Sequence, residues 1–291
     1  MSDENTEAAE QAAPEAKIAP EPAPAPVVRR QSVVMRTGSC DMRVGTGALD
    51  QLGNAARIAA GKPSRALLVS GDDIDAELTE RCSRLLKDAG FAVSLTSVPA
   101  GRAARSIENV TALYQELASE LVTADDPIVV VGDADVISLA IFAGATWHTG
   151  CPVVAVATTL DAVTDVTVTP RPIDAPAAPN MLVARGNARF MIADPSVFVS
   201  GNLTNSELMG RAVMVAGAVS AGENSFNELA VRADGVIAAA EDTLVAAILD
   251  ITKSRARVVS SSALAMRQGI LYGQAIGRAL ERAVESQHPD A

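Results

Sequence analysis

The stretch Pro127-Ile128-Val129-Val130-Val131-Gly132 decides the fold class. Four consecutive β-branched residues between a proline and a glycine are typical of a short strand in the middle of a parallel sheet, buried on both faces. Residues 136–146 follow it with the pattern of a helix. Further strands are predicted at 65–70, 91–97 and 152–156, separated by helical patterns at 75–89 and 106–122. This alternation predicts an α/β fold with a doubly wound, mostly parallel, Rossmann-like sheet.

The chain is expected to divide into three parts. Residues 1–34 are rich in Ala, Pro and Glu and lack apolar periodicity, which predicts a disordered tail. Such a tail serves either to solubilise the protein or to tether it to a partner. The predicted Rossmann-like domain covers 35–199. Residues 200–291 are predicted to form a truncated helical domain, with helices over 234–253 and 262–286.

Composition limits the function classes. The net charge of −11 and the pI near 4.7 argue against nucleic acid and anionic membranes as partners. The sequence contains no run of about 20 apolar residues, so no membrane span is predicted. The N-terminus lacks the pattern of a secretory signal, in which a basic segment is followed by an apolar one. The three scattered cysteines are predicted to be buried, reduced thiols, as in a cytoplasmic protein.

A second stretch suggests a family. Residues 273–281, with the sequence Gly-Gln-Ala-Ile-Gly-Arg-Ala-Leu-Glu, resemble the metal-binding helix of the 3-dehydroquinate synthase family, Gly-His-Thr-x-Gly-His-Ala-x-Glu. Other segments match that family in the same order over about 42–285: 44–49, 99–106, 142–146, 156–160 with Asp165, and 193–195. Glycerol dehydrogenase and its iron-dependent relatives share the fold and are the nearest confusable family.

The resemblance implies a reaction and its cofactors. Enzymes of this family use NAD and a divalent metal, usually zinc, to convert a seven-carbon sugar-acid phosphate into 3-dehydroquinate in the shikimate pathway of aromatic amino acid biosynthesis. The three metal-ligand positions correspond here to Val213, Gln274 and Arg278. An aliphatic side chain, an amide and a cation do not hold zinc, so we expect no zinc site.

The resemblance also implies where NAD would bind. The corresponding residues are Asp72, Gly101, Gly132, Thr158, Thr159 and Asp165. The glycine-rich turn of the family appears here as Gly132-Asp133-Ala134, which adds a carboxylate near the phosphates. Two like charges about 4 Å apart repel by roughly 1 kcal/mol in water and roughly 4 kcal/mol near a protein surface. We therefore expect NAD binding to be possible but weakened.

The catalytic positions of the family have changed as well. Ser138 stands for an aspartate, Arg171 for the lysine of a Gly-Gly-Lys loop, and Ala216 for a second lysine. The resemblance therefore implies a pseudoenzyme, a carbon-oxygen lyase scaffold that has lost catalysis and has a scaffold or regulatory role. Family members also continue further past the Gly-His motif. We expect the apolar face of helix 262–286 either to join the core or to contact a partner in a homo- or hetero-oligomer.

Two alternatives remain open. The first is an active 3-dehydroquinate synthase with a relocated site drawn from His148, Asp135, Asp165 and Glu281. Asp133 and Asp135, at alternate positions after a strand, either hold Mg²⁺ or form a solvated turn. The second alternative is a nucleotide-binding sensor.

Overall fold

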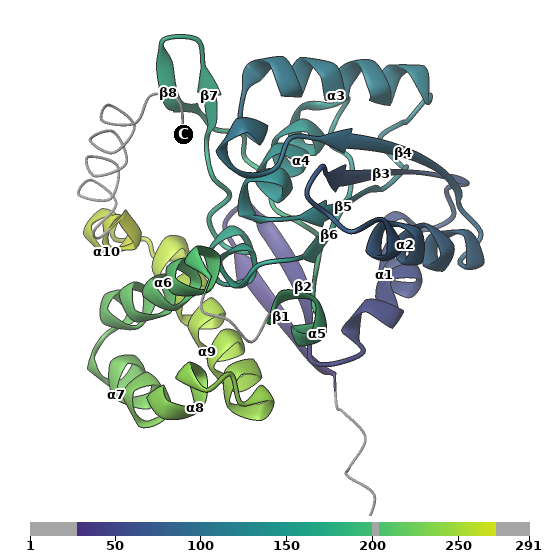
Figure 1. The fold of residues 1–291 in the computed structure, drawn as a ribbon. Helices are drawn as coiled ribbons and strands as arrows, with labels where there is room; N and C mark the ends of the chain where they lie inside the picture. Colours follow the sequence, from purple (N-terminus) through teal and green to yellow (C-terminus); the bar gives the residue numbers. More distant parts are fainter. Residues whose placement is uncertain (1–27, 200–203, 272–291) are drawn as a thin grey trace, which may run out of the picture.

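Seven strands form one sheet in the order β1-β2-β9-β6-β5-β3-β4 in the computed structural model, which describes residues 28–199 and 204–271 (Figure 1). The strands are β1 (Arg29–Met35), β2 (Gly38–Val44), β3 (Arg65–Gly71), β4 (Ala92–Val98), β5 (Ile128–Gly132), β6 (Val153–Ala157) and β9 (Phe190–Ala193). Every neighbouring pair is parallel except the antiparallel β1–β2 hairpin. The predicted α/β fold with a mostly parallel sheet is confirmed.

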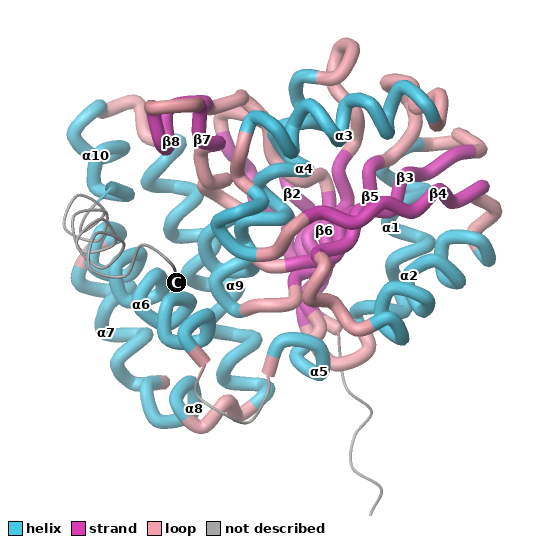
Figure 2. The backbone as a smooth tube through the Cα atoms, turned by 45° about the horizontal axis from the view of Figure 1, so that its top comes forward, coloured by secondary structure: helices cyan, strands magenta, loops and turns pink. Residues whose placement is uncertain are grey.

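Helices cover both faces of the sheet (Figures 1 and 2). They are α1 (Leu52–Ala60) and α2 (Ala76–Asp88) on one face, and α3 (Ile107–Ser119) and α4 (Ala134–Thr146) on the other. Side chains of β5 alternate between the two apolar layers: Ile128 and Val130 pack with α3 and α4, whereas Val129 and Val131 pack with α1 and α2. This alternation explains why the run 128–131 is uniformly apolar.

The remaining described residues are mainly helical. Their elements are the hairpin β7 (Ile173–Ala175) and β8 (Ala178–Leu182), then α5 (Pro195–Phe198), α6 (Asn205–Ala221), α7 (Glu223–Val231), α8 (Ala233–Ile237), α9 (Glu241–Ser260) and α10 (Leu264–Gln268). Short 3-10 turns occupy Ala48–Gln51, Gly101–Ala104 and Gly269–Leu271, and a π turn occupies Ala162–Val166. Gln31 of β1 donates from Nε2 to the carbonyl oxygen of Leu249 in α9 at 2.9 Å, which joins the helices to the sheet.

Three details differ from the sequence-based expectation. Residues 29–34, assigned to the tail, form β1, because Val33 and Met35 are buried against β2 and α9. The helix predicted over 234–253 is broken into α8 and α9 at Ala239, whose φ of 52° lies outside the helical region. The helix predicted over 262–286 contains only the short α10 and one turn up to residue 271. Its remainder lies outside the described residues.

Two further observations bear on composition. Cys40, Cys82 and Cys151 are buried free thiols, as predicted. No helix within 28–199 and 204–271 combines the length and apolar character that crossing a membrane requires.

Candidate functional site

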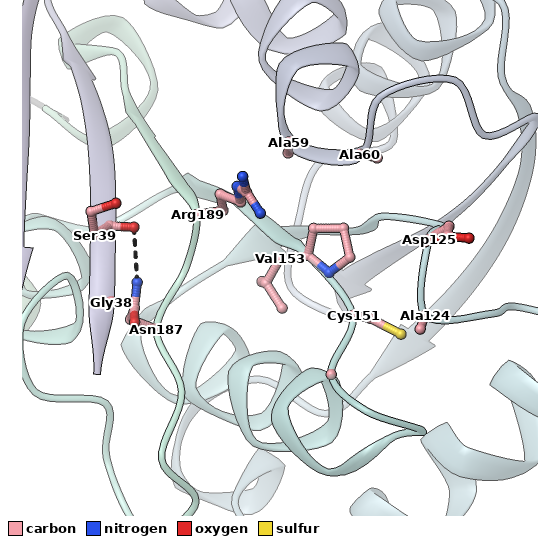
Figure 3. A pocket seen from close by; sticks show the side chains of 12 residues that line it. Gly38, Ser39, Ala59, Ala60, Ala124, Asp125, Cys151, Val153, Asn187 and Arg189 are labelled. Carbon is pink, nitrogen blue, oxygen red and sulfur yellow. Dashed lines mark hydrogen bonds between the residues drawn. The ribbon is translucent and has the colours of Figure 1, made fainter. Parts of the chain in front are cut away.

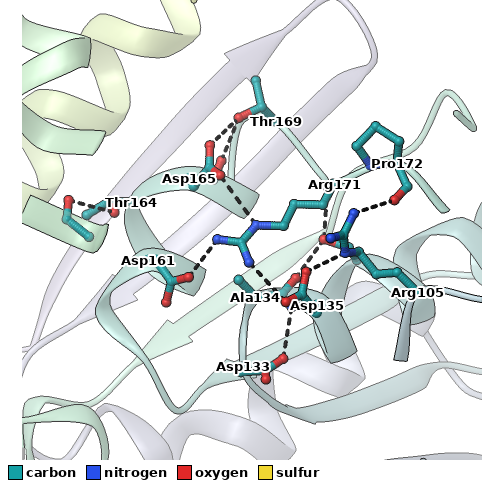
Figure 4. A network of polar contacts seen from close by, with 12 residues as sticks. Arg105, Asp133, Ala134, Asp135, Asp161, Thr164, Asp165, Thr169, Arg171 and Pro172 are labelled. Atoms are coloured by element: carbon teal, nitrogen blue, oxygen red, sulfur yellow. Dashed lines mark hydrogen bonds and ion pairs between the residues drawn. The ribbon is translucent and has the colours of Figure 1, made fainter. Parts of the chain in front are cut away.

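The candidate site is a network of charged side chains beyond the carboxyl ends of β5 and β6 (Figure 4). Ligands of parallel α/β sheets bind at this edge of the sheet. The network contains the arginines Arg105, Arg171 and Arg255 and the aspartates Asp135, Asp161 and Asp165.

Arg171 lies at the centre of the network. Its Nη1 is 3.1 Å from Asp135 Oδ2, its Nη2 is 2.6 Å from Asp161 Oδ2, and its Nε is 3.7 Å from Asp165 Oδ2. Burial by itself lowers the pKa of Arg171, but the negative charges of Asp135, Asp161 and Asp165 outweigh burial and raise the pKa above its ordinary value. The guanidinium is therefore a permanent cation, with a carboxylate facing each of its nitrogens.

Arg105 holds the other side of Asp135. Its Nε lies 2.6 Å from Asp135 Oδ1, and its Nη1 donates to the carbonyl oxygen of Pro172 at 2.9 Å and to Asn180 Oδ1 at 2.8 Å. Asp135 is thus enclosed between two arginines. The site is also tied to the backbone, since the amide of Arg171 donates to Ser138 Oγ at 2.9 Å.

Arg255 enters the network from α9. Its Nη2 donates to Asp165 Oδ1 at 2.7 Å and to Thr169 Oγ1 at 2.8 Å. Burial lowers the pKa of Arg255, and the charge of Asp165 opposes that effect. Three cations and three carboxylates therefore balance one another, and each positive charge of the network is already paired.

A second group of polar contacts lies at the start of α4. Asp133, the residue before the helix, accepts hydrogen bonds through Oδ1 from the amides of Asp135 at 2.8 Å and Val136 at 2.9 Å. Its Oδ2 accepts from the amide of Gly101 at 2.7 Å, and Asp72 Oδ1 accepts from the amide of Ala100 at 2.8 Å. Two aspartates therefore hold the loop after β4 against β3 and α4.

A hollow lies elsewhere, at the amino edge of the sheet (Figure 3). It has a volume of about 550 Å³, and its lining includes Cys151, Asp125 and Arg189. Burial, followed by the charges of Asp126 and Asp125, raises the pKa of Cys151 to about 11, so this thiol is a poor nucleophile at neutral pH. We place the candidate site at the carboxyl edge, where charged groups converge.

Comparison with known proteins gives a consistent family. Residues 95–208 match the family model for the 3-dehydroquinate synthase N-terminal region. The 3-dehydroquinate synthase of Symbiobacterium thermophilum is 29% identical over 245 residues, covering 83% of this chain and 68% of the relative. That of Caulobacter vibrioides is 29% identical over 259 residues, covering 88% of this chain and 70% of the relative. The chain is similar to the 3-dehydroquinate synthases over most of its length.

Solved structures agree on the fold. A 2-deoxy-scyllo-inosose synthase complexed with carbaglucose-6-phosphate, NAD+ and Co2+ superposes with a TM-score of 0.76 at 15% identity, covering 88% of this chain and 69% of that chain. ValA, a 2-epi-5-epi-valiolone synthase from Streptomyces hygroscopicus subsp. jinggangensis 5008 with NAD+ and Zn2+ bound, gives 0.58 at 17% identity, covering 80% and 60%.

The described residues do not fit a metal of the kind found in those structures. Val213 and Ala216 lie half-buried on α6, and neither side chain carries a donor atom. Gln274 and Arg278 lie outside the described residues. Within 28–199 and 204–271 no group of three or more His, Cys, Asp or Glu side chains is arranged to hold a metal ion. Each carboxylate around Arg171 already faces an arginine.

The residues that the resemblance assigns to NAD lie along one edge of the sheet, at or beyond the ends of β3, β4, β5 and β6. Gly132 has a local reason to be glycine, because a Cβ there would lie 2.6 Å from Val136 Cγ1. The amide of Thr158 donates to the carbonyl oxygen of Gly132 at 3.0 Å, whereas the buried Thr159 Oγ1 has no hydrogen-bond partner among the residues that the structure describes. Asp165 is engaged by Arg171 and Arg255.

Of the alternative site drawn from His148, Asp135, Asp165 and Glu281, the described residues bring Asp135 and Asp165 together on Arg171 but leave His148 apart. His148 is exposed just beyond the carboxyl end of α4, whereas Asp135 lies in its first turn, so the 13-residue helix separates them by about 20 Å. Glu281 lies outside the described residues. The Asp133–Asp135 pair is not a magnesium site either, because Asp133 caps the helix while Asp135 faces Arg105 and Arg171.

Sequence reasoning missed three members of the network. Arg105, Asp161 and Arg255 were not predicted as site residues. One signal was available for Arg255: it lies on the buried face of α9 with Ile248, Ile251 and Thr252, where a charged residue needs a partner. Asp161 and Arg105 carry no comparable local signal.

Proposed function

We propose that this chain is a 3-dehydroquinate synthase-like protein that has lost catalysis and acts as a scaffold or regulatory binding protein. The supporting observation is the pairing of Arg171 with Asp135, Asp161 and Asp165. The resemblance places a lysine at this position. Elimination of phosphate requires cations directed at the leaving group. A guanidinium surrounded by three carboxylates has its charge balanced before any substrate arrives.

The metal positions support the same proposal. Val213 offers no donor, and by sequence neither Gln274 nor Arg278 is a usual zinc ligand. Ala216 cannot replace the second lysine of the resemblance. A bound metal would supply Lewis acidity to the family's reaction, and the residues at these positions do not fit one.

The test is an assay of phosphate release with the purified full chain. The seven-carbon sugar-acid phosphate is supplied with NAD and either zinc or cobalt, and an intact 3-dehydroquinate synthase is run in parallel as the positive control. We expect no release above a metal-free blank. Turnover that depends on added metal would overturn the proposal.

A binding role also requires a surface. We propose that the helical part, which we place at about 200–291 after an α/β part, forms a homo- or hetero-oligomer in the cytoplasm. One exposed face of α6 carries Leu208, Ala212, Val215 and Val219, which are spaced at helical intervals. Light scattering of the full chain, alone and mixed with an intact synthase, tests this. The proposal is refuted if this chain has the mass of a monomer on its own and forms no complex with the synthase in the mixture.

A further inference from the structure

We propose that the Asp133 carboxylate is an internal substitute for the pyrophosphate of a dinucleotide, and that it keeps the corner between β4 and α4 closed to NAD. This inference deepens the proposed function, on which it rests. Asp133 directly follows β5 and is the cap of α4, a helix of 13 residues. The first amides of a helix in this position are the donors that bind a phosphate group in dinucleotide-binding folds.

Both oxygens of Asp133 are used. Oδ1 accepts from the amides of Asp135 and Val136, and Oδ2 accepts from the amide of Gly101. These donors come from two separate chain segments, and Gly101 lies 32 residues before Asp133 in the sequence. A carboxylate that caps a helix needs only the helix amides. The additional bond to Gly101 means that one side chain fills the space between the helix and the facing loop.

The facing loop is fixed from its other side as well. Ala100 donates its amide to Asp72 Oδ1 at 2.8 Å, so Asp72 and Asp133 hold two consecutive amides. Gly101 adopts a φ of +62°, and a Cβ there would meet no atom of the described residues within 4 Å, so backbone conformation rather than crowding explains this glycine. The loop is therefore held against α4 without a ligand.

An incoming pyrophosphate would face two obstacles. It would have to displace Asp133 from the three amides, although this carboxylate is attached to the chain and always present at high effective concentration. It would also meet the negative charges of Asp72, Asp73 and Asp133. Burial, followed by the charge of Asp133, raises the pKa of Asp73, which shows that the corner already disfavours negative charge. The residues present therefore do not fit the pyrophosphate of NAD.

The test is Asp133→Gly, which frees the three amides and removes the charge. Binding of NADH is measured on the full chain by fluorescence titration and by calorimetry. We expect D133G to bind NADH at least tenfold more tightly than the wild-type chain. Asp133→Ser is the second variant, because serine still caps a helix but is too short and uncharged to hold the loop. It should also gain affinity, and it remains informative if D133G does not fold.

The matched control is Asp75→Gly. Asp75 caps α2, another helix of 13 residues, and accepts the amide of Glu77 at 2.9 Å. D75G should lose similar helix stability and gain no affinity for NADH. A folded D133G or D133S that binds no better than the wild type, or a gain of the same size in D75G, would overturn the inference. Wild-type binding of NADH as tight as that of D133G would also overturn the inference. The proposed loss of catalysis is tested separately, by the assay of phosphate release.

Discussion

Arg255 and Asp165 form an ion pair between the helical part and the sheet, with Nη2 and Oδ1 2.7 Å apart. The arginine comes from α9 and the aspartate from the π turn after β6. The Arg255 side chain is 4% exposed, so the pair is shielded from water. Breaking it should therefore cost more than breaking a surface ion pair.

Replacing Arg255 with methionine tests this pair. R255M keeps much of the aliphatic volume but, among the described residues, leaves Asp165 with Arg171 as its only charged partner. We expect the free energy of unfolding to fall by about 3 kcal/mol, measured by urea denaturation. The control is Arg257→Met on the exposed side of the same helix, which should change stability by less than about 0.5 kcal/mol. Equal losses in the two variants would contradict the structural role of the pair.

Close packing of α6 on the segment after β6 gives a second prediction. A Cβ at Gly210 would lie 2.5 Å from Leu160 Cγ and 2.9 Å from the amide nitrogen of Asp161. Gly210→Ala should therefore destabilise the chain by about 1–3 kcal/mol through overpacking.

A matched glycine provides the comparison. Gly269 has a helical φ of −56°, and a Cβ there would meet Ser220 Cβ only at 3.8 Å. Gly269→Ala should be neutral or slightly stabilising in thermal melts. If G210A melts like the wild type, α6 is not seated on Leu160 as described.

The acidic rim formed by Asp72, Asp73 and Asp133 predicts a dependence of stability on pH. Burial and the charges of Asp133 and Asp72 raise the pKa of Asp73 in the folded protein, so its ionised form disfavours folding. The cost is absent below the pKa of the unfolded chain and appears as pH rises through the folded-state pKa. Because Asp73 is partly exposed, Asp73→Asn should stabilise by only a few tenths of a kcal/mol at neutral pH and not at about pH 3.

The matched substitution is Asp88→Asn at the end of α2. Parallel pH profiles for D73N and D88N, obtained from urea denaturation, would show that the rim carries no excess repulsion.

The buried cysteine thiols should be alkylated only slowly in the native protein. Burial raises the pKa of Cys82 to about 12 and that of Cys151 to about 11, and it also raises the pKa of Cys40. The thiolate is the reactive form, so iodoacetamide at about pH 8 should leave all three unmodified in the folded chain and label them in urea. Mass spectrometry measures this. Rapid labelling of a native thiol would contradict its burial.

The sequence predicts the sheet better than the site for a physical reason. The strand at 128–131 follows from local composition, because a run of valines is stable where both faces are covered. The contact between Asp161 and Arg171 depends on the path of the chain after β6. The contact between Asp165 and Arg255 joins residues that are 90 positions apart in the sequence. Local patterns carry no information about such pairings.

Asp133 and Asp135 show the same limit at closer range. Their spacing fits a metal pair or a turn equally well. In the structure Asp133 precedes α4 and caps it, whereas Asp135 lies in the first turn and pairs with Arg105 and Arg171. The spacing alone does not distinguish these two roles. A helix-start signal was present, since aspartate often precedes the first turn. β1 was missed because the tail around it is rich in proline, which obscures the alternation at Val33 and Met35.

The pairing of α9 with the π turn also sets the size of the cooperative unit. If the helices separated while the sheet stayed intact, Asp165 would lose Arg255 in an interior that poorly tolerates uncompensated charge. Partial opening is thus penalised, and calorimetry should record one transition for the folded body.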